Sequence, residues 1–536
     1  MSDAIPSRSE PPEGAAPATS DGEPASAGLR APVAGALGAV AGIGLSELVA
    51  GILGAPSLLA AIGAAVIDNQ PAGAKDLVVA LFGTNDKLAL EALIVVIAAV
   101  VGALLGALAV RRSFALAATG FGAFAIAGFL ASLRSPAAAP TTAMIVALVA
   151  AIGGVQAMSF LLRTAGAGRT MTGAPVAAVG PDWSRRGFLL RAGAVAVASS
   201  VAGLLGRRLL EGGTAGGGGA PPVALPAAAV TASIPPGAEL SQAGLTPLVV
   251  PNDEFYRIDT ALITPGVDAA TWRLRIHGLV DRETTLTYAE LAELPMIEQY
   301  VTIACVSNEV GGNLVGNAKW TGVRLREVLA IAGVQSSATQ LVGRSVDGWT
   351  AGMPTAWVMD PRREPMIALK MNDEPLPRAH GFPARLIIPG LFGYVSATKW
   401  LSELELTTLE GFNGYWIPLG WAKDGPILTQ SRIDTPRNGQ SLPAGRVAIA
   451  GVAWAPDRGV SKVEVAIDGV WREATLSTPI SDATWVQWLV AWDATPGPHA
   501  ILVRATDGDG ALQAAERTPP APDGARGNHA IQVTIG

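Results

Sequence analysis

Cysteine is almost absent from this chain, with a single residue, Cys305, among 536. A disulfide framework within the chain is therefore excluded, and no set of cysteines and histidines has the spacing that a zinc site requires. Histidine is also scarce: there are four, and none precedes His277. Because haem in a membrane bundle is usually held by histidines, we expect no haem in the N-terminal half.

Charged residues are few as well. Asp, Glu, Lys and Arg make up 15% of the chain, against about 25% in ordinary soluble domains, while 50% is hydrophobic and the mean hydropathy is +0.38. The net charge of −6 and the lack of a basic block argue against nucleic acid as a partner. Phosphate-loop and dinucleotide-binding fingerprints are missing too. The composition instead predicts that part of the chain lies in a membrane.

The apolar excess is concentrated between residues 31 and 210. A run of about 20 apolar residues is long enough to cross a bilayer as a helix. Residues 56–87 are too broken for that and predict a re-entrant or interfacial segment. The five expected spans lie near 31–55, 88–110, 114–133 and 141–162, and over the run FLLRAGAVAVASSVAGLLG that begins at Phe188.

Arginines near the ends of these runs predict the orientation. Placing them in the cytoplasm gives a chain that starts inside, crosses five times and has everything after about residue 210 outside. Arg134, on the outer side, is the exception. We therefore expect a multi-pass protein of the cell membrane with an extracytoplasmic C-terminal part. The arginines that carry this orientation are Arg111, Arg112, Arg163, Arg169, Arg185 and Arg186.

The segment SRRGFLL, residues 184–190, precedes the last span. It resembles the twin-arginine export signal, which translocates a domain that has already folded. The alternative is an ordinary membrane anchor whose arginines only obey the positive-inside rule.

Composition and periodicity divide the chain further. Short strand-like runs such as 272–280 alternate with short helical pieces after residue 236, and from 426 onward strands and Asp-Gly turns dominate. The fold class is therefore multi-domain, with an all-α transmembrane anchor, an α+β domain and an all-β sandwich of immunoglobulin type. The predicted domains are a disordered tail at 1–28, the anchor at 29–210, a flexible linker at 211–235, the α+β domain at 236–425 and the sandwich at 426–536.

Cys305 follows the apolar run YVTIA and precedes a polar loop with two glycines. A thiolate at the end of a strand is a suitable ligand for a soft metal, although a lone cysteine in such a run is more often a small buried hydrophobic residue. Three further segments of the sequence favour the metal ligand over the buried hydrophobic residue. They are GNAKWTGVRLREVLAIAG (316–333), VGRSVDGWTAGMP (342–354) and MNDEPLPRAHGFPARLIIPGLFGYVSATKWL (371–401).

In their order and spacing, TIACVSN and these blocks resemble the molybdopterin domain of the sulfite-oxidase family. The resemblance covers about 250–425, and residues 426–536 resemble the dimerisation domain of that family. It implies an oxidoreductase that transfers an oxygen atom at a molybdenum–molybdopterin centre, with Cys305 as the protein ligand of the metal. It also implies a small-molecule substrate, an external electron carrier and a possible homodimer.

The resemblance assigns further site residues. Arg257, in PNDEFYRID, matches the arginine that faces the anionic substrate, and the loop 344–350 would shape the substrate side. Gly390 and Gly393 would let the backbone approach the cofactor closely. Asn317, Lys319 and Trp320 are interpreted as packing residues. The residues expected to contact the pterin or its phosphate are Asn252, Phe255, Tyr256, His380, Arg385, Ser396, Thr398 and Lys399.

The chain departs from the family pattern directly after the cysteine. Sulfite oxidases have basic residues there, one of which binds sulfite, whereas this chain has Glu309 and Val310. A small dianion taken from water needs fixed positive partners, so sulfite does not follow as the substrate. A neutral or larger substrate, such as a sulfoxide, fits at least as well.

Two alternatives remain open. One is a catalytically idle relative that serves as an exported structural or binding module, although Cys305 and the HGFPAR segment argue against it. The other is a membrane half that acts as a transporter or sensor. The scarcity of charge within the predicted spans argues against transport.

Overall fold

The computed structural model describes residues 29–70, 81–82, 86–135, 138–164, 185–212 and 223–536. Contacts divide the chain into two compact units. Unit 1 takes its residues from 1–42, 95–124 and 150–200, and unit 2 from 43–94, 125–149 and 201–536. The predicted disordered tail, Ser184 of the arginine motif and residues 213–222 of the predicted linker lie outside the described residues.

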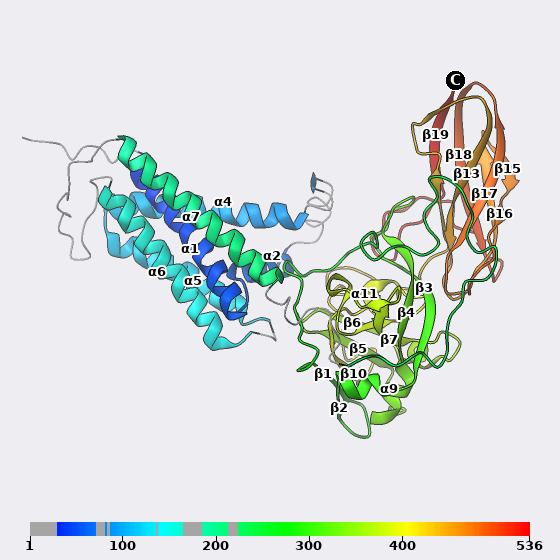
Figure 1. Cartoon of the computed structure of the whole chain (residues 1–536), viewed down its shortest axis with the longest axis horizontal. Coiled ribbons are helices and arrows are strands. Elements are labelled where there is room, and N and C mark those ends of the chain that lie inside the picture. Colours follow the sequence, from blue (N-terminus) through cyan, green and yellow to red (C-terminus); the bar gives the residue numbers. More distant parts are fainter. Residues whose placement is uncertain (1–28, 71–80, 83–85, 136–137, 165–184, 213–222) are drawn as a thin grey trace, which may run out of the picture. The chain divides into compact units, whose positions relative to one another are not determined.

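Five helices in the described part of the chain are long and apolar enough to cross a membrane. They lie at the positions predicted from the sequence and are coloured blue to green in Figure 1. The helix α2 (Leu58–Asp68) has only 11 residues and is too short to span. The five long helices are α1 (Arg30–Leu53), α4 (Asp86–Arg111), α5 (Phe114–Ser132), α6 (Pro140–Thr164) and α7 (Arg185–Gly212).

Small residues bring the helices of unit 1 together. A Cβ built on Gly35 of α1 would lie 1.9 Å from the carbonyl oxygen of Gly102 on α4, and one built on Gly106 would lie 2.1 Å from that of Ala31. Only glycine permits such a close approach of two helix backbones, which is how helices commonly pack in lipid. Five helices of this composition are compatible with membrane insertion.

The β-rich part of the chain belongs to unit 2 and begins with two sheets. One sheet has the strand order β2-β1-β10-β5-β6, and the other has the order β3-β4-β7-β8, with β9 paired to β7. The strands are β1 (Arg273–Gly278), β2 (Thr284–Thr287), β3 (Met296–Ala304), β4 (Val315–Arg324), β5 (Gln340–Ser345), β6 (Thr350–Pro354), β7 (Met366–Met371), β8 (Glu374–Pro375), β9 (Arg385–Ile387) and β10 (Leu401–Thr407).

Short helices connect these strands. Thr287 and Glu290 form a capping box at the start of α8, which satisfies two backbone N–H groups that the first turn leaves unpaired. Residues 229–232, inside the predicted linker, hydrogen-bond along β3. The helices are α8 (Tyr288–Ala292), α9 (Leu325–Ala332), α10 (Thr355–Met359), the 3-10 turn η2 (Arg378–His380) and α11 (Gly393–Ser396).

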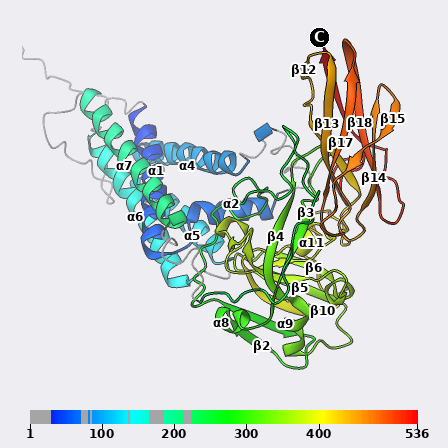
Figure 2. The ribbon, with the colours of Figure 1, turned by 45° about the vertical axis from the view of Figure 1, so that its right-hand side comes forward.

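Two further sheets, built from β11 to β19, form the C-terminal part, and strands β12 to β19 are labelled in Figure 1 or Figure 2. Their orders are β11-β13-β17-β16 and β12-β19-β18-β14-β15, and their facing sides enclose one apolar core. The immunoglobulin type of this sandwich and the predicted domain boundaries stay predictions. The strands are β11 (Gln430–Thr435), β12 (Ser441–Leu442), β13 (Gly445–Trp454), β14 (Val460–Ile467), β15 (Val470–Glu473), β16 (Thr475–Leu476), β17 (Val486–Ala494), β18 (Gly497–Asp507) and β19 (His529–Ile535).

The core of the preceding domain continues into this sandwich. Trp454 on β13 and Trp485, which directly precedes β17, are buried with the residues of the first two sheets rather than with the sandwich core. The two β-rich parts therefore share a packed boundary within unit 2.

Candidate functional site

Cys305 directly follows β3 and opens a ten-residue loop, residues 305–314, that leads into β4. The loop is closed by its own backbone, because the Cys305 N–H donates to the Leu314 carbonyl at 2.9 Å and the Asn308 N–H donates to the Cys305 carbonyl at 3.0 Å. The Asn308 side chain accepts a further bond from the Leu314 N–H at 2.8 Å. The cysteine is 8% exposed. The fold thus holds one buried thiol at a fixed strand end.

Tyr256 lies near this thiol, and a second aromatic residue packs on its ring. The rings of Phe255 and Tyr256 stack with their centroids 5.2 Å apart. Phe255 fits against Gly316 of β4, where an added Cβ would lie 2.7 Å from the ring. Burial, and next the charge of Cys305, raise the pKa of Tyr256 far above its usual value. Tyr256 is therefore a neutral hydrogen-bonding group close to the thiol.

His380 is held by the segment that opens the domain. Its Nε2 lies 2.8 Å from the backbone carbonyl oxygen of Asn252, while its buried Nδ1 has no hydrogen-bond partner among the described residues. Burial, together with the nearby charge of Arg385, lowers the pKa of His380 to about 4. The ring is therefore neutral, with its proton on Nε2 and a hydrogen-bond acceptor at Nδ1.

Arg385 begins β9 beside this histidine. One guanidinium nitrogen donates to the His380 carbonyl at 3.2 Å, and the guanidinium lies 5.3 Å from the centre of the Trp320 ring. The buried Nε has no partner within the described residues. Burial lowers the pKa of Arg385 to about 10, which still leaves it charged at neutral pH.

Asp259 joins several cations at the edge of the site. Its carboxylate lies 3.0 Å from Lys399 Nζ, 3.0 Å from Arg257 Nε and 2.6 Å from Lys87 Nζ at the start of α4, all within unit 2. Burial alone would raise the pKa of Asp259, but Lys399, Lys87 and Arg257 hold it well below its usual range. Burial lowers the pKa of Lys399 to about 8, although Asp259 opposes this change.

The structure therefore brings most of the predicted cofactor residues together. In three of them, the polar side-chain groups already form hydrogen bonds within the chain. The Ser396 hydroxyl donates to the Leu391 and Phe392 carbonyls, and the Thr398 hydroxyl donates to the Gly343 carbonyl, so both protons are used inside the chain. Asn252 contributes its backbone carbonyl, whereas its side chain bonds to Glu374 and Met371.

Arg257, predicted to face an anionic substrate, is paired with a carboxylate at the edge of the site, and its role stays a prediction. It bonds to Asp259 and, at 2.7 Å, to Thr264, and its side chain is 43% exposed. The loop 344–350 is the turn between β5 and β6, and its Val346 N–H donates to the carbonyl of Trp400, next to Lys399. The loop therefore borders the side of the site that Lys399 occupies.

Sequence reasoning did not include Asp259 in the site. Trp320, interpreted as a packing residue, is fully buried, and its ring lies against Phe255 and Arg385. Asp259 lies only two residues after Arg257, and a carboxylate so close to a predicted cation was the one available signal. Its other partners, Lys399 and Lys87, are 140 and 172 residues away, and no local pattern could connect them.

These residues fit a molybdopterin cofactor. Buried polar atoms are almost always hydrogen-bonded, because an unpaired one costs about 1–3 kcal/mol. His380 Nδ1 and Arg385 Nε are two such atoms in one neighbourhood. An acceptor, a charged donor and the cations around Asp259 suit a nitrogen-rich ring that carries a phosphate. Cys305 supplies a thiolate, the kind of ligand that soft metals prefer.

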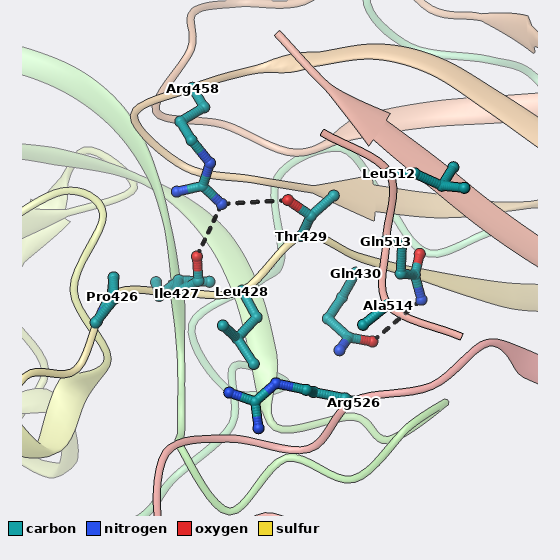
Figure 3. Close-up of a pocket in the computed structure, with 10 residues that line it drawn as sticks. All are labelled: Pro426, Ile427, Leu428, Thr429, Gln430, Arg458, Leu512, Gln513, Ala514 and Arg526. Atoms are coloured by element: carbon teal, nitrogen blue, oxygen red, sulfur yellow. Dashed lines mark hydrogen bonds between the residues drawn. The ribbon is translucent and has the colours of Figure 1, made fainter. Parts of the chain in front are cut away.

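The cavity drawn in Figure 3 lies elsewhere. It has a volume of about 330 Å³ and is lined by residues of 426–430 and 512–514 together with Arg458 and Arg526. Both arginines are already paired with carboxylates, Arg458 with Asp507 and Arg526 with Asp523. None of the predicted site residues lines this cavity, so it is separate from the Cys305 site.

Comparison with known proteins agrees with the geometry. Residues 261–416 match the family described as "Oxidoreductase molybdopterin binding domain". Human mitochondrial sulfite oxidase is 32% identical over 307 residues, which cover 48% of this chain and 56% of that protein. Nitrate reductase [NADH] from Hordeum vulgare is 29% identical over 307 residues, covering 45% of this chain and 34% of the relative.

Among solved structures, the sulfane dehydrogenase SoxCD from Paracoccus pantotrophus matches with a TM-score of 0.46 and 22% identity, over 53% of this chain and 79% of that chain. The chain spans about half the length of the sulfite oxidases from human and rat.

A buried thiol at a strand end, with a neutral histidine and buried cations in the same domain, fits an anionic metal cofactor. The matched family makes this class specific. Residues 261–416 therefore carry an oxidoreductase molybdopterin-binding domain, and the chain is similar to sulfite oxidases.

Proposed function

We propose that this protein is a membrane-anchored oxidoreductase that transfers an oxygen atom to or from a small sulfur or other oxo compound. The observation that carries the proposal is a chain of neighbours: Tyr256 lies near Cys305 and Arg385, and Arg385 lies near His380 and Lys399. Two buried nitrogen atoms of this group have no hydrogen-bond partner among the described residues. When bound, the molybdenum cofactor would supply two-electron redox chemistry and exchange of an oxo group. The residues of this chain bind it, orient it and tune its surroundings.

Each residue has a distinct proposed part. Cys305 is the protein ligand of the metal. His380 accepts a hydrogen bond at Nδ1 from the pterin, and Arg385 donates to it from Nε. Lys399 faces the phosphate, and Asp259 favours its charged form. Tyr256 is a neutral hydroxyl near the thiol, able to donate a hydrogen bond without adding charge.

The substrate proposed here is neutral, with a sulfoxide as the first candidate. Glu309 is exposed at the tip of the Cys305 loop, where sulfite oxidases carry a cation. The nearest arginine predicted for the substrate, Arg257, is already paired with Asp259. A carboxylate at the entrance and a neutralised arginine disfavour a small dianion.

The location follows from the helices and the arginines between them. We propose a multi-pass protein of the cell membrane, exported by the arginine motif at 184–190, with the site on the extracytoplasmic side. Contacts within unit 2 support this orientation, because Lys87 at the start of α4 and Arg207 near the end of α7 both bond to residues 259–262. Both helix ends are predicted to lie outside. The five-part domain division, an immunoglobulin-type sandwich that makes a homodimer, and an external electron carrier belong to the same proposal.

The decisive experiment is the molybdenum content of the full chain, purified in detergent from a host that makes molybdopterin. About one atom per chain is expected, and substrate screening would then compare sulfoxides, sulfite and nitrate. Cys305→Ser should lose the bound metal. Full activity in that variant would refute the ligand assignment. A folded, exported protein without molybdenum would refute the enzyme and favour the structural module.

A further inference from the structure

The far end of the Cys305 loop is held by the C-terminal sandwich. Arg432 on β11 donates from one guanidinium nitrogen to the Gly312 carbonyl at 2.9 Å. The same guanidinium donates to Thr246 Oγ1 at 2.8 Å and to Asp434 at 2.6 Å. Arg432 is 8% exposed. Because its three partners lie on three segments, the planar Arg432 guanidinium is held in one position. Its buried, charged hydrogen bond to Gly312 therefore fixes the loop backbone.

A second sandwich residue packs against the same turn. His529, the first residue of β19, accepts a hydrogen bond at Nδ1 from the Ile433 N–H at 3.0 Å. Its ring lies so close to Gly311 that an added Cβ there would be 2.3 Å from the imidazole. Gly311 also has φ of +80°, a conformation that favours glycine. The ring edge therefore closes the space beside the loop, next to the bond from Arg432.

The strand before the loop is tied to the sandwich as well. The Thr302 N–H donates to the Ala483 carbonyl at 2.9 Å, and the Thr302 hydroxyl accepts from the Trp485 N–H at 2.8 Å. The fully buried Trp485 ring donates to the Leu248 carbonyl at 2.8 Å. Cys305 thus lies between two attachment points, Thr302 and Gly311–Gly312, that both lead to the C-terminal sandwich.

We propose that Arg432 and His529 are positioning residues for Cys305. The C-terminal sandwich, predicted from the sequence to serve dimerisation, would then also fix the loop that carries the metal ligand. This inference rests on the proposed role of Cys305. A ligand residue must be held close to one geometry by its supporting contacts. Without the bond to Gly312 or the ring against Gly311, loop 305–314 opens more often and the thiol samples other positions.

Two conservative variants separate positioning from folding. Arg432→Lys keeps a positive charge beside Asp434, but an ammonium cannot reproduce the planar three-way contact. His529→Asn keeps an acceptor for the Ile433 N–H but removes the ring edge that faces Gly311. His499→Ala is the matched control, because His499 lies in the same sandwich and bonds to Asp468 and the Thr495 carbonyl instead.

The first readout is hydrogen exchange in the full chain in detergent. Exchange of the amides in 305–314 should accelerate about tenfold in Arg432→Lys and His529→Asn, the change expected when a charged hydrogen bond or its packing is lost. Strands β14 and β18 should keep the wild-type rates, and His499→Ala should leave the loop unchanged. The second readout is the Mo(V) electron paramagnetic resonance spectrum, whose g values should shift in both variants and not in the control.

The outcomes are distinct. Unchanged loop exchange and an unchanged Mo(V) spectrum in both variants would overturn the inference. Faster exchange throughout the sandwich would show a general structural role and would overturn it too. Faster exchange confined to the loop supports it. If that occurs while the wild type holds no molybdenum, loop anchoring stands and the proposed function fails.

Discussion

His380 Nε2 lies 2.8 Å from the carbonyl oxygen of Asn252, and this contact sets the tautomer of the imidazole. Only a protonated ring nitrogen can donate to a carbonyl, so the neutral ring carries its lone pair on Nδ1. That atom is buried without a partner among the residues described. A backbone group 128 residues earlier in the chain thus directs a hydrogen-bond acceptor toward whatever occupies the site.

The first prediction concerns stability at acidic pH. Because the pKa of His380 is lowered from 6.5 to about 4, the unfolded chain binds more protons than the folded chain between these values. The free energy of unfolding therefore falls as the pH falls through that window, by about 2 kcal/mol between pH 7 and pH 5 from this residue. Glutamine does not titrate, so the unfolding free energy of His380→Gln should depend less on pH in this window.

Thermal and chemical denaturation of the molybdenum-free full chain at pH 7 and pH 5 would measure the effect. His277→Gln is a suitable control, since it changes a histidine that bonds to Glu403 instead. The same change of unfolding free energy between pH 7 and pH 5 in wild type and His380→Gln would contradict the prediction.

Asp259→Asn should destabilise the folded protein by about 3 kcal/mol, because it leaves the buried Lys399 without its counter-charge. The side chains of Asp259 and Lys399 are 5% and 9% exposed, so solvent screens this pair little. Glu283→Gln removes the carboxylate of an exposed ion pair with Arg275 and should cost less than about 1 kcal/mol. Equal losses of unfolding free energy in the two variants would show that Asp259 does not stabilise the buried Lys399 as its counter-charge.

The sequence could place the thiol and much of its surroundings, because the informative residues cluster in short segments. Cys305 is the only thiol in the chain, and His380 and Arg385 lie in one run of six residues, HGFPAR. The long apolar runs likewise predicted five helices, since about twenty apolar residues in a row are long enough to cross a bilayer as a helix. In these cases the residues that matter lie close together in the sequence, so a short segment is enough to predict them.

Long-range contacts could not be predicted in the same way. Asp259 pairs with Arg257 only two residues away, but its other partners, Lys87 on α4 and Lys399, lie 172 and 140 positions away in the sequence. The bond from Arg432 to Gly312 joins residues 120 positions apart. Such contacts depend on how sheets pack, which single-sequence periodicity does not specify.

A substitution at the wall of the site should disturb cofactor binding. A Cβ at Gly316 would lie 2.7 Å from the ring of Phe255, which in turn contacts Tyr256 and His380. Gly316→Ala should displace that ring, cost about 1–3 kcal/mol of stability and lower the molybdenum content per chain. Adding Phe255→Leu removes the clash and should restore part of the stability. If Gly316→Ala alone kept its full molybdenum content, Phe255 would not line the cofactor site.

The charge at the entrance gives the sharpest test of the substrate. Glu309 is exposed on the Cys305 loop, at the position where the resemblance to sulfite oxidases predicts a cation. Glu309→Gln removes the negative charge, and Glu309→Arg reverses it. Since two charges in an entrance region interact by about 1–4 kcal/mol, Glu309→Arg should lower the KM for sulfite about tenfold or more, with Glu309→Gln between it and the wild type.

The KM for a neutral sulfoxide should change little in either variant, because no full charge enters with it. Steady-state kinetics with both substrates on the molybdenum-loaded full chain would separate the two effects. A KM for sulfite that stays constant across all three proteins would mean that Glu309 does not face the entering substrate. The departure at this position would then reflect solvation of the loop tip, and selectivity would depend on Arg257 and the turn at 344–350.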